Sequence, residues 1–298
     1  MTYSFLDPEV LGRLGAIPLE SRQPMLGNVA GRHRSPNRGS SVEFAEYRKY
    51  VQGDDTRRLD WKAYARSDRY YIKEFEADTN LLAHILLDTS GSMAFADKGI
   101  SKIEFARKIA ASLSYLAVDQ GDAAGLSCIS TKLQLEIPPR RRASHLQTIF
   151  KTLAETEPKG ETGLVEGLHS IAEKVPRRGL IVILSDLFCD PDAFSDALQH
   201  LKYRKHDVVV FHLMDPQEID FEFERPHRFV DLEDNSTIVA EPVLIADEYR
   251  EIVQEFLTDI RRRCHDANVD YRLVRTTENY ESVLSTFLLD RLPKKGSR

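Results

Sequence analysis

Short hydrophobic runs alternate with longer amphipathic segments along most of this chain. The runs at 82–87, 179–185 and 208–213 are almost continuously apolar, which is typical of strands buried on both faces of a parallel sheet. Segment 102–119 repeats its apolar residues every three or four positions, which predicts a helix with one buried face. The alternation predicts an α/β fold with a doubly wound, mostly parallel sheet flanked by helices.

The other elements follow the same reasoning. Further strands are predicted at 123–130, 133–137 and 269–274, and further helices at 145–155, 164–175, 193–202, 247–265 and 280–289. Pro138-Pro139 is expected to end the strand 133–137, which suits a sheet edge. Residues 217–245 alternate apolar and polar positions around a turn at Asp234-Asn235-Ser236, which predicts a small inserted β element.

The first 80 residues differ from the rest. Residues 27–39 are rich in Gly, Arg, Ser and Asn, and residues 41–76 are dense in charges and aromatics without a clear period. We therefore predict an N-terminal arm, residues 1–80, packed on a main domain, residues 81–298. Charged residues of the arm are expected to form an ion-paired brace that docks Trp61 on the main domain, with a partner-binding role as the alternative.

Charge and composition narrow the function. The formal net charge of −6 argues against a dedicated nucleic-acid binder. No stretch approaches the roughly 20 apolar residues that a membrane span requires, and the acidic N-terminus does not have the pattern of a signal peptide. The three cysteines are far apart and form no C-x-x-C pair, which favours a reducing, cytoplasmic location.

Oxygen-bearing side chains gather at predicted strand ends. Asp88-Thr89-Ser90-Gly91-Ser92 directly follows the strand 82–87, Thr162 lies in a loop before a helix, and Asp186 follows the strand 179–185. The carboxyl ends of parallel strands share one edge of an open α/β sheet, where ligands bind. Carboxylates and hydroxyls suit a small hard cation, which predicts Mg²⁺, with Mn²⁺ or Ca²⁺ as substitutes, and not Zn²⁺.

Two other interpretations apply to the same residues. Asp, Ser and Thr are common turn formers and helix N-caps, but the agreement of three separate loops favours a cation site. A metal-dependent phosphohydrolase of haloacid dehalogenase-like type also places a nucleophilic Asp after its first strand. Its general acid would stand two positions later, where this chain has Ser90. The sequence also lacks a phosphate loop, a nucleophile elbow and an H-E-x-x-H pair, so we expect no enzymatic activity.

A D-x-S-x-S loop after the first strand, a loop threonine beside Gly and an aspartate after a later buried strand resemble the metal-ion-dependent adhesion site of von Willebrand factor A domains, which have a Rossmann-like fold. The resemblance covers about residues 81–274. It implies that hydroxyls bind the cation directly and that carboxylates hold its waters. The implied hydroxyl ligands are Ser90, Ser92 and Thr162, and the implied carboxylates are Asp88 and Asp186. In many of those domains a Gly follows the last aspartate, whereas Leu187 stands there in this chain.

A second set of motifs resembles the signature of domain-of-unknown-function family 58. The motifs are Tyr47-Arg48-Lys49-Tyr50, Gly53-Asp54-Asp55, Arg58-Leu59-Asp60-Trp61, Ala65-Arg66 and Asp88-Thr89-Ser90-Gly91-Ser92-Met93. Members of that family are typically bacterial, and many are encoded beside MoxR-type AAA+ ATPases that are thought to assemble or mature protein complexes. The resemblance therefore implies a MoxR-type ATPase, a client protein, or both, as partners.

These observations predict a non-enzymatic module that binds a partner protein through a divalent cation. An open coordination position of the cation would accept a carboxylate from an Asp or Glu of the partner. The phosphohydrolase and a metal-independent scaffold are the alternatives.

Overall fold

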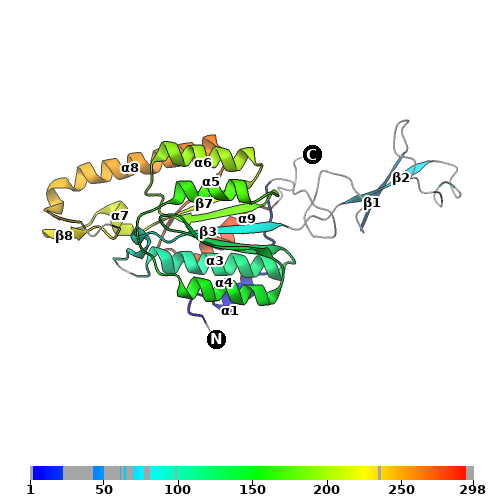
Figure 1. Ribbon diagram of the computed structural model, residues 1–298, viewed down its shortest axis with the longest axis horizontal. Helices are drawn as coiled ribbons and strands as arrows, with labels where there is room; N and C mark the ends of the chain where they lie inside the picture. Colours follow the sequence, from blue (N-terminus) through cyan, green and yellow to red (C-terminus); the bar gives the residue numbers. More distant parts are fainter. Residues whose placement is uncertain are drawn as a thin grey trace. The chain divides into compact units, whose positions relative to one another are not determined.

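The computed structural model describes residues 3–22, 43–49, 61, 64, 70–76, 81–97, 99–233 and 236–292. The chain divides into two compact units. Residues 1–20 and 82–298 belong to the first, and residues 21–81 to the second. The first unit is an α/β domain built around a central sheet (Figure 1).

The central sheet has the strand order β10-β7-β6-β3-β4-β5. Its strands are β3 (Leu82–Asp88), β4 (Ala123–Ile129), β5 (Leu133–Arg140), β6 (Leu180–Ser185), β7 (Asp207–Met214) and β10 (Asp270–Arg275). Neighbours run parallel except for β4 and β5. Strands β4, β6 and β7 are buried along their whole length, as is β3 beyond its first residue. The prediction of a doubly wound, mostly parallel sheet is confirmed.

Helices cover both faces of this sheet (Figure 1). One layer contains α1 (Pro8–Leu14), α3 (Lys102–Asp119), α4 (Ala143–Glu155) and α9 (Tyr280–Asp290). The other contains α5 (Leu164–Lys174), α6 (Pro191–Tyr203) and α8 (Pro242–Asp266). On the second face, Leu86 and Ile183 of the sheet pack with Leu168, Leu198 and Ile260 of the helices. No helix of the described residues is long and apolar enough to cross a bilayer.

Helix α3 begins with a capping box that fixes its first turn. The hydroxyl of Ser101 accepts from the backbone N–H of Glu104, and the Glu104 carboxylate accepts from the backbone N–H of Ser101 at 3.0 Å. This start places Lys102, the first residue of the helix, in the buried interior.

Strand β5 is longer than the sequence predicts. It continues through Pro138-Pro139 to Arg140 and pairs antiparallel with β4 at one edge of the sheet. The edge position is as expected, but the prolines do not end the strand. Of two successive residues in a strand only one has its N–H on the outer side, where an edge strand tolerates proline. The pairing with β4 also shifts register between Ala124 and Leu126, opposite the prolines, and such an irregularity accommodates the other proline.

The segment after β7 contains both helix and strand. Helix α7 (Pro216–Asp220) comes first, and β8 (His227–Val230) then pairs antiparallel with β9 (Thr237–Ala240). The hairpin matches the small β element expected within 217–245. The start of that range is helical instead, because Asp215 and Glu218 form a capping box, and its end belongs to α8.

The first twenty residues belong to the α/β unit, which differs from the expected arm of residues 1–80. Arg13 of α1 donates to both carboxylate oxygens of Glu281 at 2.6 and 2.8 Å. The backbone N–H of Leu19 donates to Gln120 Oε1 at 2.8 Å, and Arg291 Nε donates to the carbonyl of Glu20 at 2.7 Å. The separate segment therefore begins after Glu20.

The second unit contains an antiparallel pair, β1 (Glu43–Lys49) and β2 (Tyr71–Glu76). Trp61 is 62% exposed within this description of the chain, and its burial against the main domain stays a prediction. Its ring makes an edge contact with Tyr64, which stacks on Tyr70, so the aromatic residues pack with one another and leave the indole exposed. Docking of this segment on the main domain stays a prediction. The charged residues expected in the brace lie outside the described residues: Asp54, Asp55, Arg57, Arg58, Asp60 and Arg66.

Candidate metal centre

The candidate site lies where the strand order of the sheet reverses. The chain leaves β3 toward β4 on one side and later returns to place β6 on the other side of β3. Crevices for ligands form at such switch points, beyond the carboxyl ends of the strands. Asp88 ends β3, Ser185 ends β6 and Asp186 follows it directly, so the fold itself brings these residues to one place.

The loop after β3 turns its oxygens toward one another. The backbone N–H of Ser90 donates to Asp88 Oδ1 at 2.9 Å, and the hydroxyls of Ser90 and Ser92 lie 3.1 Å apart. Ser90 precedes a short 3-10 helix, η2 (Gly91–Ala94), but its side chain makes no capping hydrogen bond. The hydroxyls of this loop therefore face each other and are not used as a helix cap.

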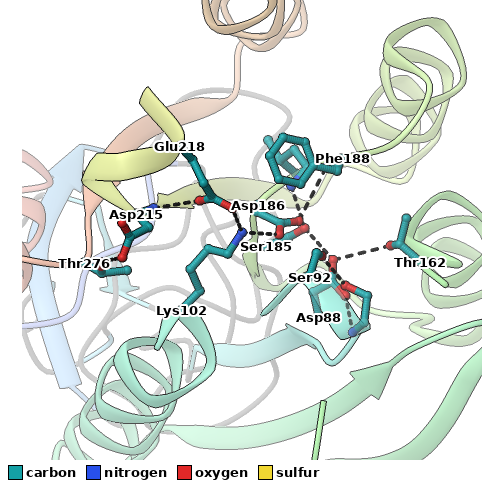
Figure 2. Close-up of polar contacts among 12 residues, drawn as sticks. Asp88, Ser92, Lys102, Thr162, Ser185, Asp186, Phe188, Asp215, Glu218 and Thr276 are labelled. Atoms are coloured by element: carbon teal, nitrogen blue, oxygen red, sulfur yellow. Dashed lines mark hydrogen bonds and ion pairs between the residues drawn. The ribbon is translucent and has the colours of Figure 1, made fainter. Parts of the chain in front are cut away.

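Thr162 reaches the same point from the loop before α5. Its hydroxyl donates to Asp88 Oδ2 at 3.5 Å (Figure 2). The loop is held by backbone hydrogen bonds from Lys159 N to the carbonyl of Thr89 at 2.9 Å and from Gly91 N to the carbonyl of Gly160 at 2.8 Å. Gly163, not Thr162, is the N-cap of α5. Capping thus does not account for the position of the Thr162 hydroxyl.

Asp186 lies at the same strand end but takes part in a second network. Its Oδ2 accepts from the ammonium of Lys102 at 2.7 Å, and its Oδ1 accepts from the backbone N–H of Phe188 at 3.5 Å. Figure 2 shows Lys102 between Asp186 and Glu218, which it also contacts. The second oxygen of Glu218 accepts from the backbone N–H of Asp215 at 2.8 Å. Asp186 is thus shared between the cation site and a buried lysine.

Leu187 has a backbone φ of +56°, in the left-handed region. Its side chain is buried in the core and its N–H donates to the hydroxyl of Ser185 at 2.9 Å. A residue with a Cβ pays about 1–2 kcal/mol for this conformation, and Gly does not. The departure noted in the sequence, a leucine where related motifs have glycine, is therefore a strained position directly beside Asp186.

Burial and charge set the protonation of the site. Burial raises the pKa of Asp88 to about 6, and the negative charge of Asp186 acts in the same direction. The hydroxyl of Ser185, 2.6 Å from Asp88 Oδ2, opposes the rise. Burial alone would lower the pKa of Lys102, but Asp186 and Glu218 together raise it above its ordinary value. A divalent cation would stabilise the charged form of Asp88 in the same way.

The side chains fit a hard cation better than a softer one. Four of the five predicted residues contribute oxygens linked by the contacts above: Asp88, Ser90, Ser92 and Thr162. Within the described ranges, no group of three or more His, Cys, Asp or Glu side chains is arranged to hold a metal. A site built on hydroxyls and one or two carboxylates suits a cation that keeps part of its water shell, as Mg²⁺ does.

Three residues of the site were not expected from the sequence. Ser185 directly precedes Asp186, and in the sequence it looks like an ordinary last residue of a strand. Only the structure shows that its hydroxyl contacts Asp88. The sequence could have indicated a role for Lys102. A lysine in the first turn of a helix is unfavourable beside the positive end of the helix dipole, so a nearby carboxylate is expected to pair with it. Glu218 had a signal too, as the third residue of a capping box after Asp215.

Residues 46–261 match the family described as protein of unknown function DUF58. The chain belongs to this family. The resemblance drawn from the sequence motifs is thereby confirmed. The uncharacterized protein Rv1480 of Mycobacterium tuberculosis (strain ATCC 25618 / H37Rv) is 28% identical to this DUF58 protein over 218 residues, which is 72% of this chain and 68% of the relative. The uncharacterized protein Mb1516 of Mycobacterium bovis (strain ATCC BAA-935 / AF2122/97) gives the same values.

Solved structures with a similar fold include BatB from Bacteroides thetaiotaomicron, a conserved hypothetical protein, with 16% identity, a TM-score of 0.47, and coverage of 71% of this chain and 98% of that one. An aerotolerance-related membrane protein from Bacteroides fragilis NCTC 9343 has 19% identity and a TM-score of 0.45, with 70% and 96% covered. The SpRpn10 VWA domain has 11% identity and a TM-score of 0.43, with 70% and 95% covered. These are loose similarities of fold.

Proposed function

We propose that this DUF58 protein is a non-enzymatic module that binds a partner protein through a divalent cation. The observation that carries the proposal is the convergence of oxygens from two loops on one carboxylate: the hydroxyls of Ser90 and Ser92 lie together beside Asp88, and Thr162 donates to Asp88 from the second loop. None of these hydroxyls caps a helix.

The residues would share the cation as the adhesion-site resemblance implies. Ser90, Ser92 and Thr162 would bind it through their hydroxyls, while Asp88 and Asp186 would hold its waters and supply negative charge. Mg²⁺ is the proposed ion, and Mn²⁺ or Ca²⁺ would substitute. When bound, the ion offers an open position to an anionic oxygen, so the expected partner contributes an Asp or Glu side chain.

The surface near the site supports a protein partner. Apolar side chains are exposed on the β8–β9 hairpin and on the first turn of α8. They include Leu232 (42% exposed), Ile238 (68%), Val239 (76%), Val243 (68%) and Leu244 (78%). Exposed apolar residues that gather in one region are typical of protein-interaction surfaces. The backbone of Leu232 and Glu233 also lies against Gly91, so the hairpin adjoins the candidate site.

The proposed partner is a MoxR-type AAA+ ATPase, a client protein with an acidic contact residue, or both. This choice rests on the family, and it places the protein in the assembly or maturation of other protein complexes. The phosphohydrolase alternative has less support in the site. Ser90 stands at the position that needs a general acid, and its hydroxyl contacts Ser92.

A capture assay with a purified MoxR-type ATPase tests the proposal. Such ATPases need Mg²⁺ themselves, so the decisive comparison keeps Mg²⁺ constant and changes this chain. Thr162→Ala should reduce capture at least tenfold without lowering the thermal midpoint of the metal-free protein. Thr131→Ala, an exposed threonine in the neighbouring loop, is the matched control and should bind like the wild type. Undiminished capture by Thr162→Ala would reject the cation bridge. Release of phosphate from an aryl phosphate, lost in Asp88→Asn, would favour the enzyme.

A further inference from the structure

The hairpin between β8 and β9 lies directly on the cation loop. A Cβ added at Gly91 would collide with the carbonyl oxygen of Leu232 and would lie 3.2 Å from the Cα of Glu233. The two backbones are thus in contact at a position where only glycine leaves enough room. Residues of the hairpin therefore form one wall of the candidate metal centre.

Two hydrogen bonds hold the backbone of Asp231 and Glu233, which follow β8. The backbone N–H of Glu233 donates to Asp231 Oδ1 at 2.7 Å, and the backbone N–H of Asp231 donates to the carbonyl of Ser236 at 2.9 Å. These bonds fix the backbone at Glu233 while it lies against Gly91.

The Glu233 carboxylate is directed into the site. Its Oε1 is buried and has no hydrogen-bond partner among the described residues. Burial raises the pKa of Glu233, and the neighbouring hydroxyl of Ser92 and backbone of Thr162 oppose that rise. The carboxylate thus lies beside two of the proposed ligands. A buried carboxylate oxygen without a partner is costly, and a cation at this point would satisfy it.

We propose that Glu233 is an internal ligand of the cation. Its carboxylate takes the coordination position that an acidic side chain of the partner would occupy, so the Glu233 side chain must leave that position before the partner binds. This inference rests on the proposed function and adds its regulation. Because Glu233 is tethered to the site, its effective concentration is high, and a partner must outcompete it. Only a carboxylate ligand that binds the cation more strongly than the tethered Glu233 would displace it, so weak carboxylate ligands would not bind.

Mn²⁺ binding to the full chain tests the inference, with water proton relaxation as the readout. Bound Mn²⁺ accelerates relaxation in proportion to the number of exchanging waters that it carries. Glu233→Gln should weaken Mn²⁺ binding by about tenfold or more and should increase the relaxation enhancement of the bound ion, because water replaces the carboxylate. Glu241→Gln, an exposed residue after β9 whose side chain makes no capping bond, is the matched control and should change neither quantity.

Acetate serves as the competing carboxylate. Added to the Mn²⁺-loaded proteins, it should lower the relaxation enhancement of Glu233→Gln by displacing the new water and should leave the wild type unchanged. Equal relaxation enhancement in wild type and Glu233→Gln would overturn the inference while leaving the metal site intact. A difference in Mn²⁺ affinity alone would not rescue the inference, because the charge of Glu233 can change the affinity without binding the ion directly. No Mn²⁺ binding to the wild type would instead reject the proposed function and this inference with it.

Discussion

The ammonium of Lys102 lies 2.7 Å from Oδ2 of Asp186, and both side chains are almost completely buried. Lys102 also contacts Glu218, so a single lysine neutralises two carboxylates beside the proposed cation site. The lysine and a bound divalent ion would therefore act on the same aspartate. The stability of the metal-free protein and its response to metal should be linked through Asp186.

Lys102→Met tests this link. Removing one member of a buried ion pair leaves the remaining charge unpaired, so we expect the free energy of unfolding of the metal-free protein to fall by about 3–5 kcal/mol. Mg²⁺ should restore more stability in the variant than it adds to the wild type, because Asp186 becomes available to the ion. Urea unfolding with and without Mg²⁺ measures both effects. Lys108→Met, on the same helix, is the control, and equal Mg²⁺ responses in Lys102→Met and wild type would separate Asp186 from the ion.

Mg²⁺ should raise the thermal midpoint of the wild type by a saturable amount. An ion that binds only the folded state stabilises it by mass action, by about 2.7 kcal/mol at a hundredfold excess over Kd. The double variant Ser90→Ala with Ser92→Ala should lose this shift, measured by calorimetry. Ser282→Ala with Ser285→Ala, on the surface of α9, should keep it. A full Mg²⁺ response in the first double variant would show that these hydroxyls are not ligands.

At position 187, the glycine variant should be more stable than the alanine variant, which is the reverse of the usual order. Leu187→Ala removes a buried side chain and should cost about 2–5 kcal/mol of the free energy of unfolding. Leu187→Gly removes slightly more but relieves the left-handed backbone, so it should be more stable than the alanine variant by about 1 kcal/mol. At Leu184, a buried residue of β6, glycine should be the less stable of the two. Chemical denaturation of the four variants measures their free energies of unfolding. If alanine is more stable than glycine at both positions, the backbone at Leu187 is not strained.

The metal-free protein should lose stability as the pH falls from about 6.5 to about 4. Burial lowers the pKa of His84 and of His212 to about 4 in the folded protein, so in this window the unfolded chain binds more protons. Each histidine then lowers the free energy of unfolding by about 1.4 kcal/mol for every pH unit of acidification within this window. Asp88 acts in the opposite direction, because its raised pKa means that the folded protein gains its proton between about 6 and 3.8.

Two variants separate these contributions in urea unfolding at pH 7, 6 and 5 without metal. His84→Gln keeps a polar group near Ser127 and should make the pH dependence shallower. Asp88→Asn should make it steeper, since it removes the group that gains a proton on folding. Unchanged slopes in both variants would contradict the assigned protonation states.

The sheet was predictable because its strands are buried on both faces. Such strands have unbroken apolar sequences, and the predicted bounds of β3, β6 and β7 agree with the structure to within one or two residues. Helix α1 was missed, although Asp7 and Pro8 form an N-cap with a proline in the first turn, because seven residues are too few to show a period.

The candidate site was predictable only where its residues follow strands. Asp88, Ser90 and Ser92 share one loop, and the order of strands brings Asp186 to the same edge. Thr162 reaches it from the loop between α4 and α5. The contributions of Ser185, Lys102 and Glu233 depend on side-chain contacts between distant elements. In particular, the approach of Glu233 to Gly91 is set by how the β8–β9 hairpin folds back, which no local spacing encodes.

Pro138 and Pro139 lie in β5, at one margin of the central sheet. A strand at a margin presents free N–H and C=O groups with which a second molecule can extend the sheet. The two prolines have no N–H to offer, and the side chains of Glu136 and Arg140 put charges on either side of them. This margin therefore resists the strand addition that leads to swapped dimers and cross-β aggregates.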